Sequence, residues 1–512
     1  MRIVFLALLG VLAVPMAGQT FMRAYSQAPF TQPGLILPED AIGMSDGTWV
    51  FTAFDGYLVH TNAAGEPLRT FSVTDAGGGA LASVNLDYLA QAGPNQLYVA
   101  GNTSSDTLFI LKLSLDGTII WQRSYRTPDN YPRAIRTMPD GGLIVLAITA
   151  RGTSQSSIPV LTRIDASGNL VWQRRYYNAN PANGRMNWYD LNLAANGDLL
   201  VTGTTTPAAP QRVIAARISP TGAVLWAKEW NASNNNNEFG RTIAELANGQ
   251  IKVLVNNPVP GTQFGTVRLS AAGDLISSTA YSGGGANVTR AHIQASGRIT
   301  GALTNLSVVF GLAPDGTPAF AHTYDLQNGS SLLLNTMFPT SDGGLMTFGG
   351  YTYSFFGDFA CVLLKTSADG LLPPGYSTPL TLTQVGYTPT LSTVPLGDST
   401  FGALNAGLIN VASAAVVYDT LLGTPPLALD PVVAPLFHLG PNPATETLRL
   451  TYDGGTGATW RILDLSGRIL KTGVILPGQQ EVLLPVTALA SGRYLCEVLA
   501  EGHRQGMVFI KP

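Results

Sequence analysis

Side chains that commonly carry metal or acid–base chemistry are few and widely spaced in this sequence. The chain has 512 residues and five histidines. No two histidines stand at the HxxxH or HExxH spacing that places two metal ligands on one helix face. No G-x-S-x-G segment, which would expose a serine nucleophile on a tight turn, is present. The histidines are His60, His292, His322, His438 and His503. Local motifs therefore predict no catalytic residue, no metal ligand and no cofactor contact.

Glycine-rich and Asp-Gly segments are the second group that could do chemistry. Gly77–Gly79 and Gly283–Gly285 lack the Lys-Ser/Thr pair of a phosphate-binding loop. Asp46, Asp140 and Asp342 each precede a glycine, which favours a turn-forming role over paired carboxylates that cleave a glycosidic bond. Such a pair can still form between residues far apart in sequence, so glycoside cleavage remains open.

A strand–turn–strand pattern positions these residues and recurs along the chain. In its clearest copy, Arg163-Ile164 ends one extended run, Asp165 to Asn169 form the turn, and Leu170-Val171-Trp172 begin the next run. Glycine suits such a turn because it adopts positive φ without steric cost, and Asp, Ser and Asn bond their own backbone. Three copies carry a tryptophan four residues after the turn glycine: Gly117 with Trp121, Gly168 with Trp172, and Gly222 with Trp226.

Weaker copies extend the pattern to seven turns. The turn glycines are Gly65, Gly117, Gly168, Gly222, Gly273, Gly316 and Gly370. Their spacing of about fifty residues is typical of propellers and other repeat arrays. A second turn recurs inside each unit, as at Asp140-Gly141 and Asn196-Gly197, so each unit holds about four short strands, which is one propeller blade. The sequence predicts an all-β chain with a seven-bladed β-propeller.

The ends of this repeat indicate how the ring closes. Most units carry a second aromatic residue eight positions after the turn glycine, such as Tyr176. After Gly370 the chain continues Leu371-Leu372-Pro373-Pro374, and proline lacks the N–H that a ladder needs. Phe21 to Tyr25 has the same aromatic spacing near the N-terminus. We therefore expect an N-terminal strand to complete the last blade.

Composition limits the classes of protein to consider. Charged residues make up 12% of the chain, against about 25% in average domains, and 56 glycines and 33 prolines suit short strands and many turns. The net charge of −3 gives no case for a nucleic-acid partner. Cys361 and Cys496 fall in different expected domains, so a disulfide framework is not predicted.

The first residues indicate export. Residues 1–19 combine Arg2, an apolar run from Ile3 to Val14, and small residues at Ala17 and Gly18. This arrangement predicts a secretory signal peptide. No later run is long and apolar enough to predict a transmembrane segment.

The remaining chain divides into three predicted parts. Residues 20–370 form the propeller. Residues 371–433 are nearly uncharged and rich in Thr, Gly and Pro, and we expect a linker with some β-structure packed on the last blade. Residues 434–512 contain about seven short strand patterns, which predict a separate small β-sandwich.

The C-terminal part carries a set of motifs in fixed order. They are Pro441-Asn442-Pro443, Asp464-Leu465-Ser466-Gly467-Arg468, Leu489 with Gly492 and Tyr494, and the terminal Phe509-Ile510-Lys511. In this order they resemble the type A sorting domain of type IX secretion in Bacteroidota. The resemblance implies recognition by the outer-membrane translocon, removal of the domain, and release or attachment to surface lipopolysaccharide. Pro512 after Lys511 departs from the pattern, and an ordinary Ig-like accessory domain is the alternative.

The blades also invite comparison with known repeats. A turn glycine followed by tryptophan resembles quinoprotein-like propellers, in which the tryptophan packs between adjacent blades. Ser114, Asp116, Gly117 and Trp121 are similar to the sialidase Asp-box, although that motif has one residue between Asp and Gly. The sequence identifies neither the calcium site nor the quinone contacts of a quinoprotein, so we expect Trp121, Trp172 and Trp226 to be packing residues.

Three functions remain open for the exported propeller. The first is a binding module for a glycan, a peptide or a matrix ligand, displayed on the cell surface or released. The second is a hydrolase or lyase acting on extracellular polysaccharide, which acidic or histidine side chains converging near the channel would favour. The third is a structural adhesin. A flat, uncharged face with exposed aromatic residues would favour the binding module.

Overall fold

The computed structural model describes residues 20–512 except for segments at loops and at the junction of the two units. The undescribed internal segments are 28–37, 54–55, 76–83, 104–107, 126–129, 150–157, 179–184, 207–210, 232–236, 284, 286, 304–306, 326–330, 353–358, 401–403, 407–408, 414–415, 423–436, 453–456, 465–467 and 501–502. The predicted signal peptide at 1–19 lies outside the described residues. The chain forms two compact units, residues 1–424 and 425–512, and every described element is a β-strand.

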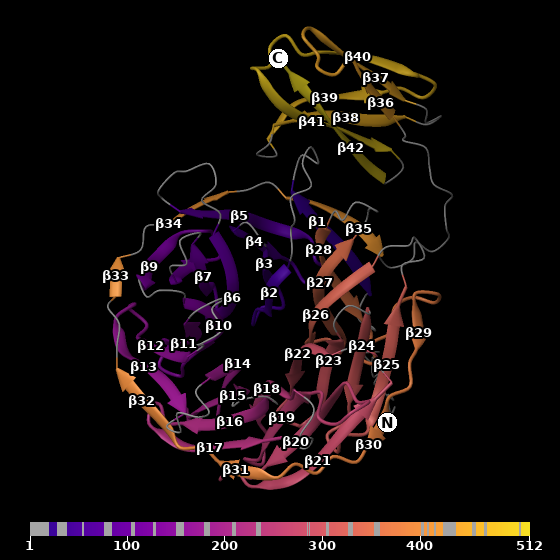
Figure 1. Cartoon of the computed structure of the whole chain (residues 1–512). Helices are drawn as coiled ribbons and strands as arrows, with labels where there is room; N and C mark the ends of the chain where they lie inside the picture. The colour runs from indigo at the N-terminus through magenta and orange to yellow at the C-terminus, as the bar shows by residue number, and fades with distance from the viewer. Residues whose placement is uncertain are drawn as a thin grey trace, which may run out of the picture. The chain divides into compact units, whose positions relative to one another are not determined.

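The first unit contains seven antiparallel sheets arranged around a common centre (Figure 1). We number them along the chain. Sheets 1 to 3 are, from the centre outward, β2 (Pro38–Gly43), β3 (Trp49–Ala53), β4 (Tyr57–Thr61) and β5 (Pro67–Asp75); β6 (Val84–Gly93), β7 (Gln96–Thr103), β8 (Leu108–Ser114) and β9 (Ile119–Tyr125); and β10 (Asn130–Thr137), β11 (Leu143–Thr149), β12 (Ile158–Ile164) and β13 (Leu170–Asn178).

The next three sheets repeat this order. They are β14 (Arg185–Leu193), β15 (Leu199–Thr206), β16 (Arg212–Ile218) and β17 (Val224–Trp230); β18 (Phe239–Glu245), β19 (Ile251–Asn256), β20 (Phe264–Leu269) and β21 (Leu275–Ser282); and β22 (Val288–Ile293), β23 (Ile299–Leu303), β24 (Val308–Leu312) and β25 (Pro318–Tyr324).

Sheet 7 combines strands from both ends of the repeat region. It contains β26 (Ser331–Pro339), β27 (Leu345–Thr352), β28 (Phe359–Thr366) and the N-terminal strand β1 (Phe21–Gln27). β1 pairs antiparallel with β28, with Phe21 opposite Lys365 and Tyr25 opposite Cys361. The expected partner of the N-terminal strand is confirmed. Side chains of sheets 1 and 7 also share one apolar cluster, in which Phe51 and Phe348 stand with ring centroids 5.1 Å apart.

Six of the seven predicted turn glycines join the third and fourth strands of their sheets, and Gly370 follows β28, the third strand of sheet 7, where the chain leaves that sheet. Each has a positive φ, between 74° at Gly370 and 94° at Gly316. Glycine adopts this backbone without the steric cost that a Cβ brings. The second series of turns joins the first and second strands in the same way, and its glycines at 47, 141, 197, 249, 297 and 343 are also at positive φ.

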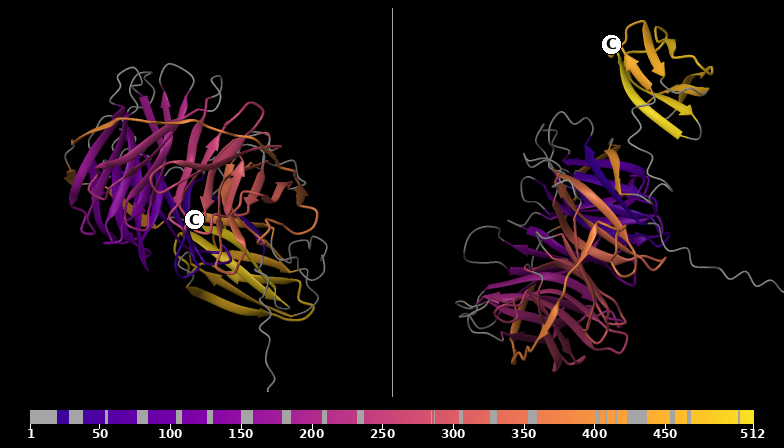
Figure 2. Two further views of the ribbon diagram at one scale, coloured as in Figure 1. Left: turned by 90° about the horizontal axis from the view of Figure 1, so that it is seen from below. Right: turned by 90° about the vertical axis from the view of Figure 1, so that its right-hand side faces the viewer.

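Residues after Gly370 form a belt around the propeller, which we define as β29 to β35. Its strands are β29 (Ser377–Pro379), β30 (Thr383–Val385), β31 (Leu391–Thr393), β32 (Leu396–Thr400), β33 (Leu404–Ala406), β34 (Ile409–Ser413) and β35 (Val416–Leu422). Each adds a fifth, outermost strand to one sheet, in the order 6, 5, 4, 3, 2, 1 and 7. The belt therefore retraces the ring in the direction opposite to the blades, as Figures 1 and 2 show along its outer edge.

This arrangement corrects the expectation that residues 371–433 pack on the last blade alone. The outer strand of every blade offers unpaired N–H and C=O groups, and the belt pairs with part of that edge in all seven sheets. In sheet 3, for example, β32 pairs with residues 174–178 of β13. Apolar belt residues fill the grooves between neighbouring sheets, as Leu382 and Val394 do.

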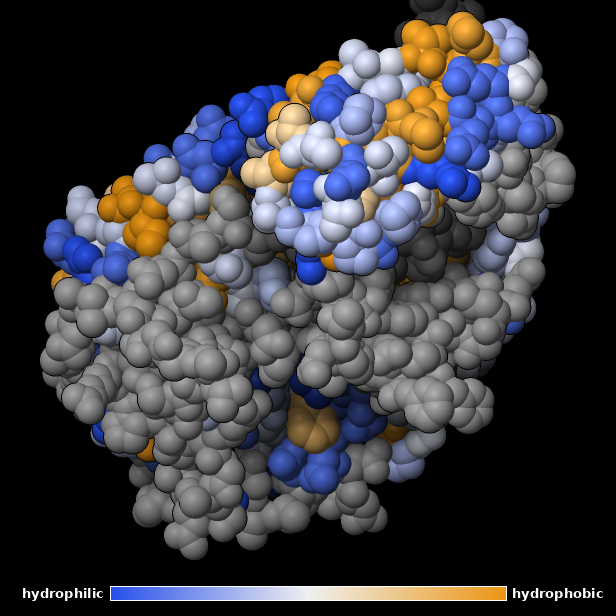
Figure 3. Space-filling view, turned by 90° about the horizontal axis from the view of Figure 1, so that it is seen from above, coloured by the Kyte–Doolittle hydropathy of each residue, from blue (hydrophilic) through white to orange (hydrophobic). Residues whose placement is uncertain are grey.

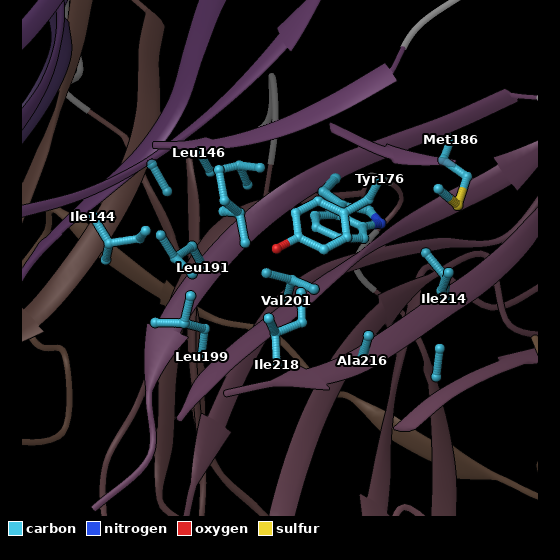
Figure 4. Packing of buried hydrophobic residues seen from close by; sticks show 14 of the residues in the cluster. Ile144, Leu146, Tyr176, Met186, Leu191, Leu199, Val201, Ile214, Ala216 and Ile218 are labelled. Atoms are coloured by element: carbon cyan, nitrogen blue, oxygen red, sulfur yellow. The ribbon is translucent and has the colours of Figure 1, made fainter. Parts of the chain in front are cut away.

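The interior lies between adjacent sheets. Figure 4 shows the cluster shared by sheets 3 and 4, where Ile144 and Leu146 of β11 meet Leu199 and Val201 of β15. All four side chains are fully buried, and burying each contributes about 1.5–3 kcal/mol. Such contacts between successive sheets hold the blades in place.

The second unit is a small β-sandwich, as the sequence predicts. One sheet contains β36 (Phe437–Gly440), β37 (Thr447–Tyr452) and β40 (Glu481–Pro485); the other contains β39 (Ile469–Ile475), β38 (Ala458–Leu463), β41 (Gly492–Ala500) and β42 (His503–Lys511). Their facing side chains, among them Leu448, Ile462 and Phe509, form one apolar core. Cys361 and Cys496 are both buried, and they form no disulfide with any residue that the structure describes. The described part of the chain has no helix that is long and apolar enough to cross a membrane.

Candidate functional site: the central pocket

The innermost strand of every sheet carries a β-bulge at the same level. The pairing with the second strand is interrupted in β2, β6, β10, β14, β18, β22 and β26. The interrupted stretches contain Glu39, Asp87, Arg133, Tyr189, Arg241, Arg290 and Asn335. A bulge bends the strand and re-aims a side chain. The bulges at 87, 133, 189, 241, 290 and 335, whose side chains the structure describes, therefore place polar side chains around the axis of the ring.

A pocket of about 460 Å³ lies at this level. All seven innermost strands contribute to its wall, which places it at the centre of the propeller. Four of the residues at the bulges line it: Arg133, Tyr189, Arg241 and Arg290. In all, four arginines and two aspartates line the pocket, a surplus of two positive charges in a chain whose net charge is −3.

Asp40 connects three sheets at the pocket wall. One carboxylate oxygen accepts a bond from Arg290 of sheet 6 at 2.8 Å, and the other accepts the backbone N–H of Leu89 in sheet 2 at 2.9 Å. Burial raises the pKa of Asp40 above its ordinary value, against the opposing effect of Arg290. The pKa of Arg290 is raised by Tyr88 and Asp40, which outweigh the effect of burial.

Asp190 has the equivalent position and the same pattern of partners. Its two oxygens accept a bond from Arg136 of sheet 3 at 3.2 Å and from the backbone N–H of Ile243 in sheet 5 at 3.0 Å. Burial raises the pKa of Asp190 above its ordinary value, against the effect of Arg136. Both carboxylates in the pocket wall are thus engaged in joining blades.

Arg133 and Arg241 differ from the other two arginines. Neither forms an ion pair with any residue that the structure describes. The Nε atom of each is buried and has no hydrogen-bond acceptor among these residues. Arg241 lies over the rings of Tyr189, at 4.9 Å from the centroid, and of Phe239, at 5.6 Å. Burial lowers the pKa of Arg241 from its usual value.

The remaining polar groups of the pocket are largely neutral. Burial raises the pKa of Tyr88 and of Tyr189, so both phenols keep their protons. Burial, followed by the charge of Arg136, lowers the pKa of His292 below 6.5. The imidazole stands with its centroid 5.9 Å from the ring of Phe338. It is therefore uncharged near neutral pH.

The aspartates that precede turn glycines lie in their turns and not in the pocket wall. Asp46 accepts the backbone N–H of Thr48 at 3.0 Å, and Asp140 accepts that of Gly142 at 3.0 Å. Asp342 accepts the backbone N–H of Gly344 at 3.3 Å and is also paired with Lys365. Each stabilises its own turn, as the spacing predicts. The described residues contain no cluster of three or more potential metal ligands.

The Asp-box-like residues likewise serve their own turn. Asp116 accepts bonds from the hydroxyl of Ser114 and from the backbone N–H of Thr118. These bonds, that of Ser114 first, lower its pKa to about 2. The carboxylate is fully exposed and points to no described ligand site.

The three tryptophans of the repeat reach the next sheet. Trp121, Trp172 and Trp226 donate their indole N–H to the carbonyls of Ala166, Pro220 and Ala271, at 3.0–3.1 Å. A Cβ on Gly168 would lie 2.8 Å from the ring of Trp121, and one on Gly273 would lie 2.9 Å from that of Trp226. Trp121 is buried, whereas Trp172 and Trp226 are half-buried. The turn glycines leave the space that these rings occupy.

The sorting-domain motifs meet near the C-terminal strand. The Asn442 side chain accepts the backbone N–H of Ile510 at 2.9 Å, and Ala444 donates to the Ile510 carbonyl at 2.8 Å. Tyr494 stacks on Phe509 at 5.6 Å and donates to the Ala490 carbonyl. Asp464 pairs with Arg468 at 3.0 Å. Lys511 ends β42, opposite Gly492, and Gly467 lies outside the described residues.

The sequence analysis did not predict the pocket residues, because they belong to no local motif. A signal was present: Arg133, Tyr189 and Arg241 each stand eight residues before the glycine of the inner turn, at 141, 197 and 249. Counting back from those glycines locates the bulge in each innermost strand. The structure thus brings together Asp40, Asp190, His292 and four arginines, which were not singled out as a group.

Comparison with known proteins finds several solved structures that resemble the chain at low sequence identity. They include streptogramin B lyase (14% identity, 68% of this chain and 98% of that chain, TM-score 0.45), virginiamycin B lyase from Staphylococcus aureus (12%, 57% and 87%, 0.38) and the polysaccharide lyase Uly1 (12%, 67% and 91%, 0.38). Likeness at this level says nothing about activity. No curated protein matches the chain.

The second unit has a specific match. Residues 439–510 fit the family described as the secretion system C-terminal sorting domain. The chain is therefore a propeller protein that carries this sorting domain, and it is exported by type IX secretion to the cell surface or the medium.

Proposed function

We propose that the exported propeller is a binding module that holds part of an extracellular glycan, peptide or matrix ligand in its central pocket. The observation that carries this proposal is the commitment of both pocket carboxylates. Asp40 and Asp190 each use their two oxygens to join three sheets. A hydrolase of glycosidic bonds needs one carboxyl group free as acid and a second free as base or nucleophile. The described residues that line the pocket form a charged cavity and include no such free pair.

The pocket is a better-supported ligand site than a flat platform. In Figure 3, the described residues on the side in view are a mixture of hydrophilic and hydrophobic ones. Concave sites with a few convergent polar groups are the usual place for a ligand. Binding in the pocket is thus better supported than binding to a flat, uncharged face.

Pocket-filling variants test this proposal in the full mature chain. Ala291 lines the pocket, so Ala291→Trp should abolish binding of any ligand found on a glycan and peptide array. Val171 is exposed on the outer strand β13, and Val171→Trp adds the same side chain there as the matched control. Equal binding by both variants, with melting curves like the wild type, would place the ligand elsewhere.

A second candidate function is elimination on an acidic polysaccharide, favoured by His292. A neutral imidazole and arginines line the same pocket. In such a reaction the imidazole takes the proton beside the carboxylate, the neighbouring C–O bond breaks as the double bond forms, and the leaving oxygen takes up a proton. Purified protein incubated with polyuronates would then generate absorbance near 235 nm, and His292→Asn would not. No absorbance from either protein leaves binding as the function.

We also propose the details of export and display. Residues 1–19 act as the signal peptide of a Bacteroidota protein, the outer-membrane translocon recognises residues 434–512, and the domain is removed as the chain is released or attached to lipopolysaccharide. The family match of the C-terminal domain supports this order of events. Mass spectrometry of the surface and medium fractions tests it by showing whether the mature chain begins near residue 20 and lacks the second unit.

A further inference from the structure

Three consecutive sheets bring Arg133, Tyr189 and Arg241 to one part of the pocket wall. They occupy equivalent bulges of β10, β14 and β18, the innermost strands of sheets 3, 4 and 5. All three line the pocket. Because the bulges share one level, the two guanidinium groups approach the same region from either side of the strand that carries Tyr189.

The two aspartates that line the pocket pair with other arginines and not with Arg133 or Arg241. Asp190 and Asp40 pair with Arg136 and Arg290, and no carboxylate that the structure describes pairs with Arg133 or Arg241. Their buried Nε atoms have no acceptor among the described residues. A buried charged donor without an acceptor is costly, and an oxyanion bound by a guanidinium would satisfy it in bidentate geometry.

Arg241 is also held in place before any ligand arrives. Its guanidinium lies over Tyr189 and Phe239 at 4.9 and 5.6 Å. Stacking of this kind suits the planar guanidinium group and not the ammonium group of lysine. Restricting the side chain in advance reduces the entropy lost on binding. The desolvated surroundings of Arg241, which lower its pKa, strengthen its attraction for an anion.

We propose that Arg133 and Arg241 form a subsite for an oxyanion, the carboxylate or sulfate group of an acidic saccharide. This proposal rests on the proposed function, because it names the ligand class of the same pocket. Tyr189 positions Arg241, and the two guanidinium groups contact the anion. The pocket, at about 460 Å³, has room for a monosaccharide unit around it.

Matched ligands and variants test the subsite in the full mature chain. Titration calorimetry at low salt should detect binding of glucuronate and of glucose 6-sulfate to the protein. The protein should bind glucose at least tenfold more weakly. Arg133→Gln and Arg241→Gln should each lose at least tenfold in affinity for glucuronate, and Arg241→Lys should lose most of that because it cannot stack or bind in bidentate fashion. Arg69, exposed on β5, supplies the control Arg69→Gln, which should bind like the wild type.

Stability provides an independent readout. Arg133→Gln removes a cation whose buried Nε atom has no acceptor among the described residues, so its ligand-free melting temperature should equal or exceed that of the wild type, while the stabilisation by glucuronate disappears. A lower melting temperature with unchanged affinity would assign Arg133 a purely structural role and overturn the proposal.

The experiments distinguish failure of the oxyanion subsite from failure of the proposed pocket-binding function. If neutral sugars bind as well as acidic ones, and Ala291→Trp abolishes both, the oxyanion subsite is wrong and pocket binding stands. If a peptide with a free C-terminal carboxylate binds better than glucuronate, and its amide does not bind, the oxyanion subsite stands and the saccharide is wrong. If no probe binds to the pocket, the proposed function fails as well.

Discussion

Replacing Tyr387 by phenylalanine tests whether the belt is anchored between the blades. Tyr387 lies between β30 and β31 and is 3% exposed. Its hydroxyl accepts the indole N–H of Trp230 in sheet 4 at 3.0 Å and donates to the carboxylate of Glu238, just before sheet 5, at 3.1 Å. Burial, followed by the charge of Glu238, raises the pKa of this phenol, so it remains a donor at any physiological pH.

The expected cost follows from these two bonds. A buried hydrogen bond to a charged group contributes about 1.5–3 kcal/mol, and a buried donor left without an acceptor costs about 1–3 kcal/mol. Tyr387→Phe removes the first and leaves the indole N–H of Trp230 without this acceptor, while the ring keeps its apolar contacts. We therefore expect a loss of about 3 kcal/mol in the free energy of unfolding.

Urea denaturation followed by tryptophan fluorescence measures this loss. Tyr376→Phe is the matched control, because Tyr376, directly before β29, packs against the apolar cluster of sheets 6 and 7 and its hydroxyl bonds to no residue that the structure describes. Its midpoint should shift by less than about 0.5 kcal/mol. A double-mutant cycle with Trp230→Phe should show a coupling of at least about 0.5 kcal/mol. Equal midpoints for Tyr387→Phe and Tyr376→Phe would refute the anchoring role.

Three further predictions concern turns, pH and export. Gly168→Ala should lower the free energy of unfolding by about 2–4 kcal/mol, because the position has a φ of +87° and the new Cβ would lie 2.8 Å from Trp121. Gly249→Ala, at a φ of +76° with open space around it, should lower it by about 1–2 kcal/mol. Equal denaturation midpoints for the two variants would contradict the packing argument. Because the pKa of His292 is lowered in the folded protein, the unfolded chain binds a proton at a higher pH than the folded chain, so stability falls as the pH drops below 6.5. His292→Asn should reduce this dependence of stability on pH. An unchanged dependence would show that His292 does not contribute. Deleting residues 434–512 should leave a folded propeller in the periplasm; surface display equal to the full chain, by protease accessibility on whole cells, would count against the sorting role.

Features that repeat locally could be predicted from the sequence. The turn glycines, the strand count within each unit and the strand at Phe21 to Tyr25 follow from short-range steric rules and from aromatic spacing. The sorting domain could be recognised from the sequence for the same reason, since its motifs lie in fixed order within one segment.

The belt could not be predicted because none of its strands carries a strong local pattern. Several have only three residues, such as β29 and β33, and their partners are distant edges offered by blades folded earlier in the chain. The pocket could not be predicted from the sequence for a similar reason. Arg133, Tyr189 and Arg241 are one residue each from three units, and they form a set only when the bulges fall into register around an axis.

The belt has a consequence for how such a protein can evolve. Propeller genes can gain or lose blades by duplicating or deleting one repeat, since each blade contacts mainly its two neighbours. Here, an inserted blade would have no fifth strand on its outer edge unless the segment 377–422 also gained a strand. That strand would have to be inserted at the matching position in the belt, which runs around the ring in the opposite direction. Two coordinated changes at distant points of the gene are far rarer than one. The belt therefore ties the number of blades in this chain to the number of strands in a second, separate segment.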